Sequence, residues 1–85
     1  MNITPDQRKL LMRKATGNTW LTESEFPQAT RERIVKHIDE LTSLDASYLI
    51  KDLILASAPV ATKYEEDDKQ FALKEIHSIM EKYGA

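Results

Sequence analysis

The chain has 85 residues, and at that length we expect one domain with one modest hydrophobic core. Hydrophobic residues make up 41% of it and charged residues 31%, a balance that is typical of a globular protein and excludes an intrinsically disordered one. The absence of cysteine excludes disulfide bonds and cysteine-ligated zinc or iron centres.

The formal net charge of −2 is unevenly distributed along the chain. Residues 1–37 hold seven basic side chains against four acidic ones, whereas residues 38–85 hold five against ten. Such asymmetry is typical either of a basic surface for an acidic partner or of two faces that attract each other within the fold. We favour the second interpretation and keep the first open.

The first predicted helix covers residues 5–16 and has the clearest boundary signals. Thr4 and Gln7 have the spacing of a capping box, in which each side chain bonds the backbone N–H of the other residue. Pro5 suits the first helical position, where its missing N–H costs nothing. Gly17 is expected to end the helix in the left-handed C′ conformation.

The connection after this helix is rich in large apolar side chains. Thr22 and Glu25 repeat the capping-box spacing and predict a short helical turn near residues 23–26. Trp20 and Phe26 are typical hot-spot residues if they are exposed, which makes them candidate partner-binding residues. The other interpretation, which we favour, is a hydrophobic plug that closes one end of a helical bundle.

A second helix is predicted over residues 28–42. Pro27 prevents a helix from running through it, because its ring would collide with the carbonyl group four residues back. Apolar residues then recur with the helical period at Ile34, Ile38 and Leu41.

A third helix is predicted over residues 44–57, with Thr42 or Ser43 as its N-cap. One apolar face of it carries Ala46, Leu49, Ile50, Leu53 and Ile54. Tyr48 and Leu55 lie on a second flank, and an apolar surface this wide indicates a central helix that is covered on two sides. If the other helices do not cover Tyr48 and Leu55, these residues form a patch suited to a partner or to self-association.

A fourth helix is predicted over residues 63–83. Thr62 and Glu65 form the third capping-box signature, and the acidic residues that follow suit the positive end of a helix dipole. Gly84 is expected to close the helix. Its buried stripe is expected to consist of Phe71, Ala72, Ile76, Ile79, Met80 and Tyr83.

Together these elements predict an all-α fold, a compact bundle or orthogonal array of four main helices plus the short turn. No stretch shows the alternation or the hairpin sequences of β-strands. Which helices pack together, and at what angles, stays open. Basic residues interrupt the N-terminal segment and no apolar run reaches membrane-spanning length, so we expect a cytosolic protein without membrane contact.

The histidines predict no metal site and the glycines predict no cofactor site. His37 precedes Glu40 by three positions and His77 precedes Glu81 by four, but a metal site needs three or four converging ligands. We expect both histidines to be solvated at the surface. Two glycines cannot form a phosphate-cradling loop, and we expect no cofactor.

Catalysis is not predicted either. No serine is paired with a base, and four short helices around one core are expected to leave little room for a pocket of about 300 Å³. The sequence therefore predicts a non-enzymatic interaction or regulatory protein that binds a protein partner or forms a homodimer. The candidate residues for this contact are Trp20, Phe26, Tyr48 and Leu55.

The alternative is a regulator that binds nucleic acid. A basic surface on the first two predicted helices would contact phosphates. Against it stand a pI of about 5.6 and the lack of a complete helix before the second predicted helix, as a helix-turn-helix would need. The candidate residues are Arg8, Lys9, Arg13, Arg33 and Lys36.

Overall fold

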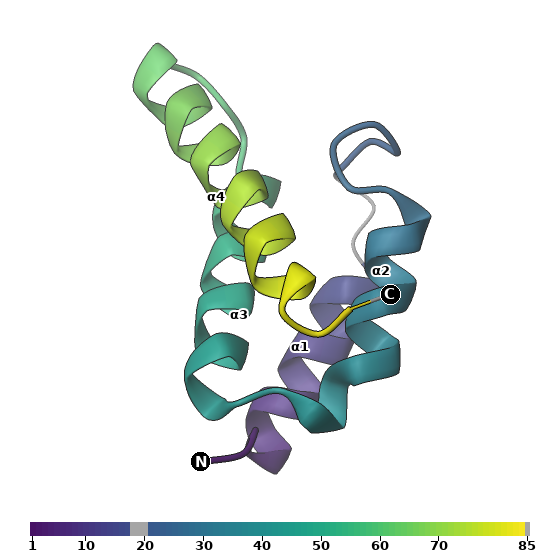
Figure 1. Ribbon diagram of the computed structural model, residues 1–85. Coiled ribbons are helices and arrows are strands. Elements are labelled where there is room, and N and C mark those ends of the chain that lie inside the picture. Colours follow the sequence, from purple (N-terminus) through teal and green to yellow (C-terminus); the bar gives the residue numbers. More distant parts are fainter. Residues whose placement is uncertain (18–20, 85) are drawn as a thin grey trace.

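The computed structural model describes residues 1–17 and 21–84, and over these ranges it confirms the all-α prediction (Figure 1). The described residues form no β-strand. Their β-type backbone pairing is an isolated antiparallel bridge between Asn2 and Thr42. The helical elements are α1 (Pro5–Gly17), α2 (Gln28–His37), the 3₁₀ turn η1 (Ile38–Glu40), α3 (Ser43–Ser57) and α4 (Lys63–Glu81).

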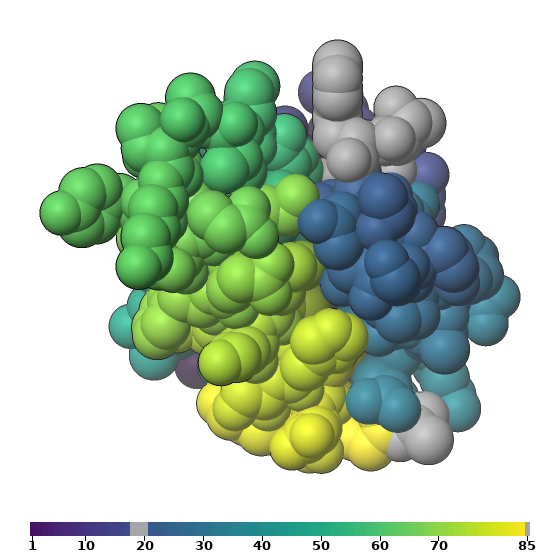
Figure 2. Space-filling view, turned by 90° about the horizontal axis from the view of Figure 1, so that it is seen from above, coloured from purple at the N-terminus to yellow at the C-terminus, as the bar shows by residue number. Residues whose placement is uncertain are grey.

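The helices α3 and α4 form an antiparallel hairpin, which is the most extensive helix pair of the molecule. The helix α1 packs against α3, and α2 contacts both α1 and α4. Figure 2 shows the segment before α2 lying beside α4, and the ammonium group of Lys69 on α4 lies 2.7 Å from the carboxylate of Glu25 there. The four helices therefore surround one shared core.

Every α-helix contributes to this core, as does the turn before α2. Phe26 is fully buried and Leu21 is 5% exposed, which confirms for these residues the plug interpretation. Trp20 lies outside the described residues. The buried hydrophobic residues are Leu11, Ala15, Leu21, Phe26, Ile34, Ile38, Leu41, Ala46, Leu49, Leu53, Ala56, Ala72, Leu73, Ile76, Ile79 and Met80.

The capping signals in the sequence correspond to real hydrogen bonds. The Thr4 N–H donates to Gln7 Oε1 over 3.0 Å, and the Gln7 N–H donates to Thr4 Oγ1 over 3.1 Å. Thr22 exchanges the same pair of bonds with the residue three positions on, and the backbone there forms the predicted short turn. Thr42 and Thr62 cap α3 and α4 by accepting backbone N–H bonds three residues ahead.

Several helix ends differ from the prediction, and α4 ends at Glu81 instead of residue 83. Gly17 is the last residue of α1 and does not take the left-handed conformation, whereas Gly84 does, with φ of 77°. The helix α2 ends at His37 instead of reaching residue 42, because η1 tightens the chain there. This turn buries both Ile38 and Leu41 and brings the carbonyl of Leu41 to the N–H of Ile3 at 3.0 Å.

Candidate protein-binding face

An exposed stripe of α3 is formed by Tyr48, Lys51 and Leu55. These residues are three and four positions apart, a spacing that places side chains on one side of a helix. Tyr48 and Leu55 are each 41% exposed, so the other helices leave the second flank of α3 partly open to solvent. The Lys51 ammonium group lies 5.0 Å from the centre of the Tyr48 ring, a cation–π distance.

A matching stripe on α4 includes two exposed aromatic residues. Phe71 is 62% exposed and Tyr64, seven positions earlier, is 83% exposed. The expectation that Phe71 belongs to the buried stripe is wrong. Ala72, Leu73 and Ile76 fill the interface with the core, and Phe71 lies outside it.

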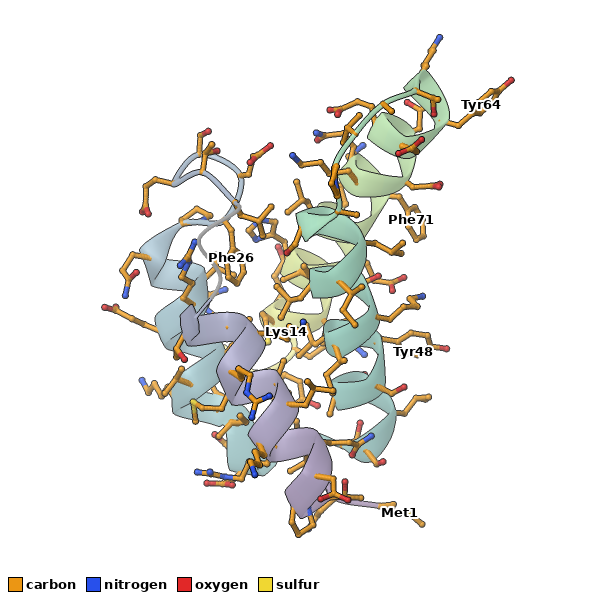
Figure 3. All side chains as sticks on the ribbon, turned by 180° about the vertical axis from the view of Figure 1, so that it is seen from behind. Met1, Lys14, Phe26, Tyr48, Tyr64 and Phe71 are labelled. Carbon is orange, nitrogen blue, oxygen red and sulfur yellow. The ribbon has the colours of Figure 1, made fainter. Side chains whose placement is uncertain are left out.

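An ion pair joins the two stripes. Lys51 Nζ lies 3.6 Å from Glu75 Oε1, and Glu75 is four positions beyond Phe71 on α4. In Figure 3, Tyr48 and Phe71 point outward on the same side of the hairpin, with Tyr64 further along that side. We call Tyr48, Lys51, Leu55, Phe71 and Glu75 the α3–α4 face.

A buried acid lies under this face. Asp52 is 0% exposed, and in the described part of the chain no hydrogen-bond donor reaches either of its carboxylate oxygens or Glu75 Oε1. Lys51 Nζ is 3.9 Å from Asp52 Oδ1. Burial and the neighbouring carboxyl group of Glu75 raise the pKa of Asp52 to about 7, against the lowering effect of Lys51.

A second surface feature is a groove of about 310 Å³ between α1 and α2. The expectation that the fold leaves little room for a hollow of this size is wrong. Arg31 at its rim is held by the fold, because its guanidinium lies 5.0 Å from the centre of the Phe26 ring and donates to two backbone carbonyls. The groove is lined by Ala15, Thr16, Gln28, Arg31, Glu32, Val35 and Lys36.

The groove offers little for bond-making chemistry. Thr16 supplies a hydroxyl group, and that hydroxyl already donates to the carbonyl of Met12 over 2.7 Å. Among the described residues that line the groove, Glu32 is the acid and none is a histidine. The described lining residues do not include the pairing of a nucleophile with a base that catalysis of the serine-hydrolase kind uses.

Of the candidate nucleic-acid residues, the structure brings Arg33 and Lys36 together and pairs Arg8 with an acid. Arg8 Nε is bound to Asp39 Oδ1 at 2.7 Å, and that exposed ion pair raises the pKa of Arg8. Lys36 lies beside the acid Glu32 at the groove. Arg33 lines a second hollow on α2 together with Ala29, Glu32 and Lys36. Lys9 and Arg13 are exposed on α1, and nucleic-acid binding stays a prediction.

The two histidines differ in their surroundings. His77 is exposed, as expected, but His37 is 8% exposed, so the expectation that it is solvated is wrong. Its Nδ1 lies 2.6 Å from Glu40 Oε2, and its ring stands 6.4 Å from that of Tyr83, because the η1 turn folds this region onto the end of α4. The described residues contain no cluster of three or more possible metal ligands.

Similarity to known proteins adds nothing to this description. The chain matches no protein-family model, no curated protein and no solved structure. Within residues 1–17 and 21–84, no helix combines the length and the apolar character needed to cross a bilayer. The candidate role of the α3–α4 face in binding therefore rests on the exposure of its side chains and on its ion pair.

Sequence reasoning identified two of the five residues of this face. It singled out Tyr48 and Leu55 because they lie outside the main apolar stripe of their helix. It missed Lys51, Phe71 and Glu75. For Phe71 a signal was present, because Ala72, Leu73, Ile76, Ile79 and Met80 already complete a buried stripe without it.

Proposed function

We propose that the protein is a non-catalytic interaction module that binds a second copy of itself through the α3–α4 face. The observation that carries this proposal is the exposure of Tyr48, Leu55 and Phe71 around one central ion pair. Large aromatic residues are enriched at the centres of protein interfaces, where they contribute most of the binding energy.

The size of the face fits a small dimer. An aromatic residue has roughly 150–250 Å² of surface to bury, so the exposed fractions of Tyr48 and Phe71 leave about 150–250 Å² of aromatic surface on the face. Tyr64, which lies further along the same side, brings the total to about 300–450 Å². A standard interface buries about 800 Å² on each partner, of which a little over half is non-polar. With Leu55 added, the exposed side chains are close to that non-polar requirement.

The charges of the face favour a second copy over a strongly charged partner. Lys51 and Glu75 carry opposite charges side by side, so the face has no net charge of its own. A two-fold interface brings the same patch of both copies together. In such a pair Lys51 of one copy can face Glu75 of the other, and each apolar residue meets an apolar region.

The test is sedimentation equilibrium of the full chain over a range of concentrations. We expect a monomer–dimer equilibrium for the unchanged protein and a loss of at least tenfold in association for Phe71→Glu, because a desolvated charge opposes the contact. Val35→Glu is the matched control, since Val35 is also a partly exposed apolar residue but lies in the α1–α2 groove.

Three results would contradict the proposal. One is a protein that stays monomeric at every concentration. Another is a dimer that Phe71→Glu leaves intact. The third is a dimer that Val35→Glu disrupts as strongly as Phe71→Glu, which would place the contact at the α1–α2 groove.

A further inference from the structure

The carboxyl group of Asp52 has surroundings that an ionised acid tolerates poorly. It is fully buried on the side of α3 that meets α4, and no donor among the described residues satisfies its oxygens. A buried carboxylate without hydrogen bonds is strongly disfavoured, and the usual response is to bind a proton. A protonated carboxyl group also becomes a donor, which two ionised carboxylates side by side lack.

Glu75 supplies the acceptor for that donor. Its carboxyl group neighbours that of Asp52, and its Oε1 is itself buried without a hydrogen-bond partner in the described structure. Two carboxyl groups that share a site hold one proton between them, as a pair. One proton therefore joins an Asp52 oxygen to Glu75 Oε1, which gives a partner to two of the three buried oxygens that the described structure leaves without one.

We infer that Asp52 and Glu75 share one proton at the α3–α4 interface and that this proton controls self-association through the α3–α4 face. The inference rests on the proposed function for its second half, and on the geometry of the buried pair for its first. Glu75 belongs to the α3–α4 face, and Asp52 is buried beneath that face. The contact between α3 and α4 therefore holds both the shared proton and the face.

The charges that act on Asp52 show how the control works. They are those of Glu75 on α4 and of Lys51 on α3, and α1 adds no further charge to this set within the described chain. When the shared proton leaves, two negative charges face a single ammonium group that is half exposed to water. Repulsion between Asp52 and Glu75 then loosens the packing of α3 on α4. The positions of Tyr48 and Phe71 relative to each other depend on that packing.

The experiment compares the unchanged chain with Asp52→Asn by sedimentation equilibrium at pH values below and above 7. Asn has the shape of the protonated acid and cannot ionise. We expect the association constant of the unchanged chain to fall about tenfold from the acidic to the alkaline side, the change that one unit of pKa difference represents. The association constant of Asp52→Asn is expected to stay constant over the same range.

A second readout on the same samples separates the inference from the proposed function. Carbon NMR of the side-chain carboxyl groups follows the titration of Asp52 and Glu75 directly, whether or not the chain dimerises. We expect the pair to take up one proton near neutral pH, and Glu75→Gln to move the remaining titration of Asp52 to lower pH.

The outcomes are distinct. A dimer whose association does not change with pH overturns the control of association, while the proposed function stands. A monomer at every pH overturns the proposed function, and the shared proton is then judged on the NMR titration alone. Ordinary acidic titration of both Asp52 and Glu75 overturns the inference altogether.

Discussion

The hydroxyl group of Tyr83 donates a 2.5 Å hydrogen bond to the carboxylate of Asp45, which joins the residues after α4 to the first turn of α3. Lys82 Nζ adds a second contact to this carboxylate at 3.3 Å. The α3–α4 hairpin is covalently connected at its other end, so these contacts close its open end. The geometry of the α3–α4 face depends on both ends being held.

The first prediction concerns the strength of this closure. Tyr83→Phe removes the donor and leaves the ring in place, so we expect the free energy of unfolding to fall by about 1.5–3 kcal/mol, the range for a hydrogen bond to a charged group. Urea denaturation followed by circular dichroism measures it. Tyr64→Phe is the matched control, because Tyr64 is 83% exposed and its loss of a hydroxyl should have no measurable effect. Equal losses for the two variants would contradict this account.

The second prediction gives the pH dependence of the same contact. Burial alone would raise the pKa of Asp45, but the hydrogen bond from Tyr83 and the charge of Lys82 outweigh it and lower that pKa. A lowered pKa in the native state means that the stability from Asp45 is present at neutral pH and is lost as the pH falls through the acidic range. The difference in unfolding free energy between the unchanged chain and Tyr83→Phe should therefore shrink on acidification. If the difference in unfolding free energy between the two proteins grew at acidic pH, this prediction would be wrong.

The third prediction concerns Asp52, whose contribution to stability changes with pH in the opposite direction from that of Asp45. Because the pKa of Asp52 is raised to about 7, the native state holds its proton more tightly than the unfolded chain does. The resulting stability is fully present below the ordinary pKa of an aspartic acid and is lost as the pH rises toward 7. The shift corresponds to a loss on the order of 2–4 kcal/mol.

Unfolding free energies of the unchanged chain and of Asp52→Asn, measured from about pH 4 to pH 8, check this third prediction. We expect the decline toward neutral pH in the unchanged chain and not in Asp52→Asn. An exposed control, Asp67→Asn, should keep the decline. A decline that persists in Asp52→Asn would show that another group binds the proton.

The sequence predicted best those features that depend on residues close to each other in the chain. The capping pairs of Thr4 with Gln7 and of Thr22 with Glu25 lie within one helical turn, and both formed as expected. The expectation for Gly17 was wrong. The preference of glycine for the left-handed conformation is only a local tendency, and in this chain Gly17 does not adopt that conformation. The η1 turn was missed since Ile38 and Leu41 fit a helical period until the bridge to the N-terminal segment is known.

The candidate site depended on contacts between helices and was only partly predictable. The burial of His37 follows from the way η1 folds against the end of α4, and no local pattern encodes that contact. Asp52 follows Lys51 in the sequence, and this local pattern does not distinguish it from a solvated acid. Its proximity to Glu75 becomes visible only once α3 is known to pair antiparallel with α4.

The fourth prediction separates folding from binding with two neighbouring leucines of α3. Leu53 is 0% exposed, and Leu53→Ala should lower the unfolding free energy by about 2–5 kcal/mol through the cavity it leaves. Leu55 is 41% exposed on the α3–α4 face, so Leu55→Ala should change stability much less and weaken self-association several-fold. Denaturation and sedimentation on both variants measure the two effects. Loss of stability without loss of association in Leu55→Ala would assign Leu55 to the core.

Concentration-dependent NMR spectra of the backbone amides test the central claim most directly. Raising the protein concentration should shift the signals of residues 48–55 and 71–75 together, with one apparent dissociation constant, and leave the exposed part of α2 unchanged. Shifts confined to α1 and α2, or spectra that do not change with concentration, would contradict self-association through the α3–α4 face.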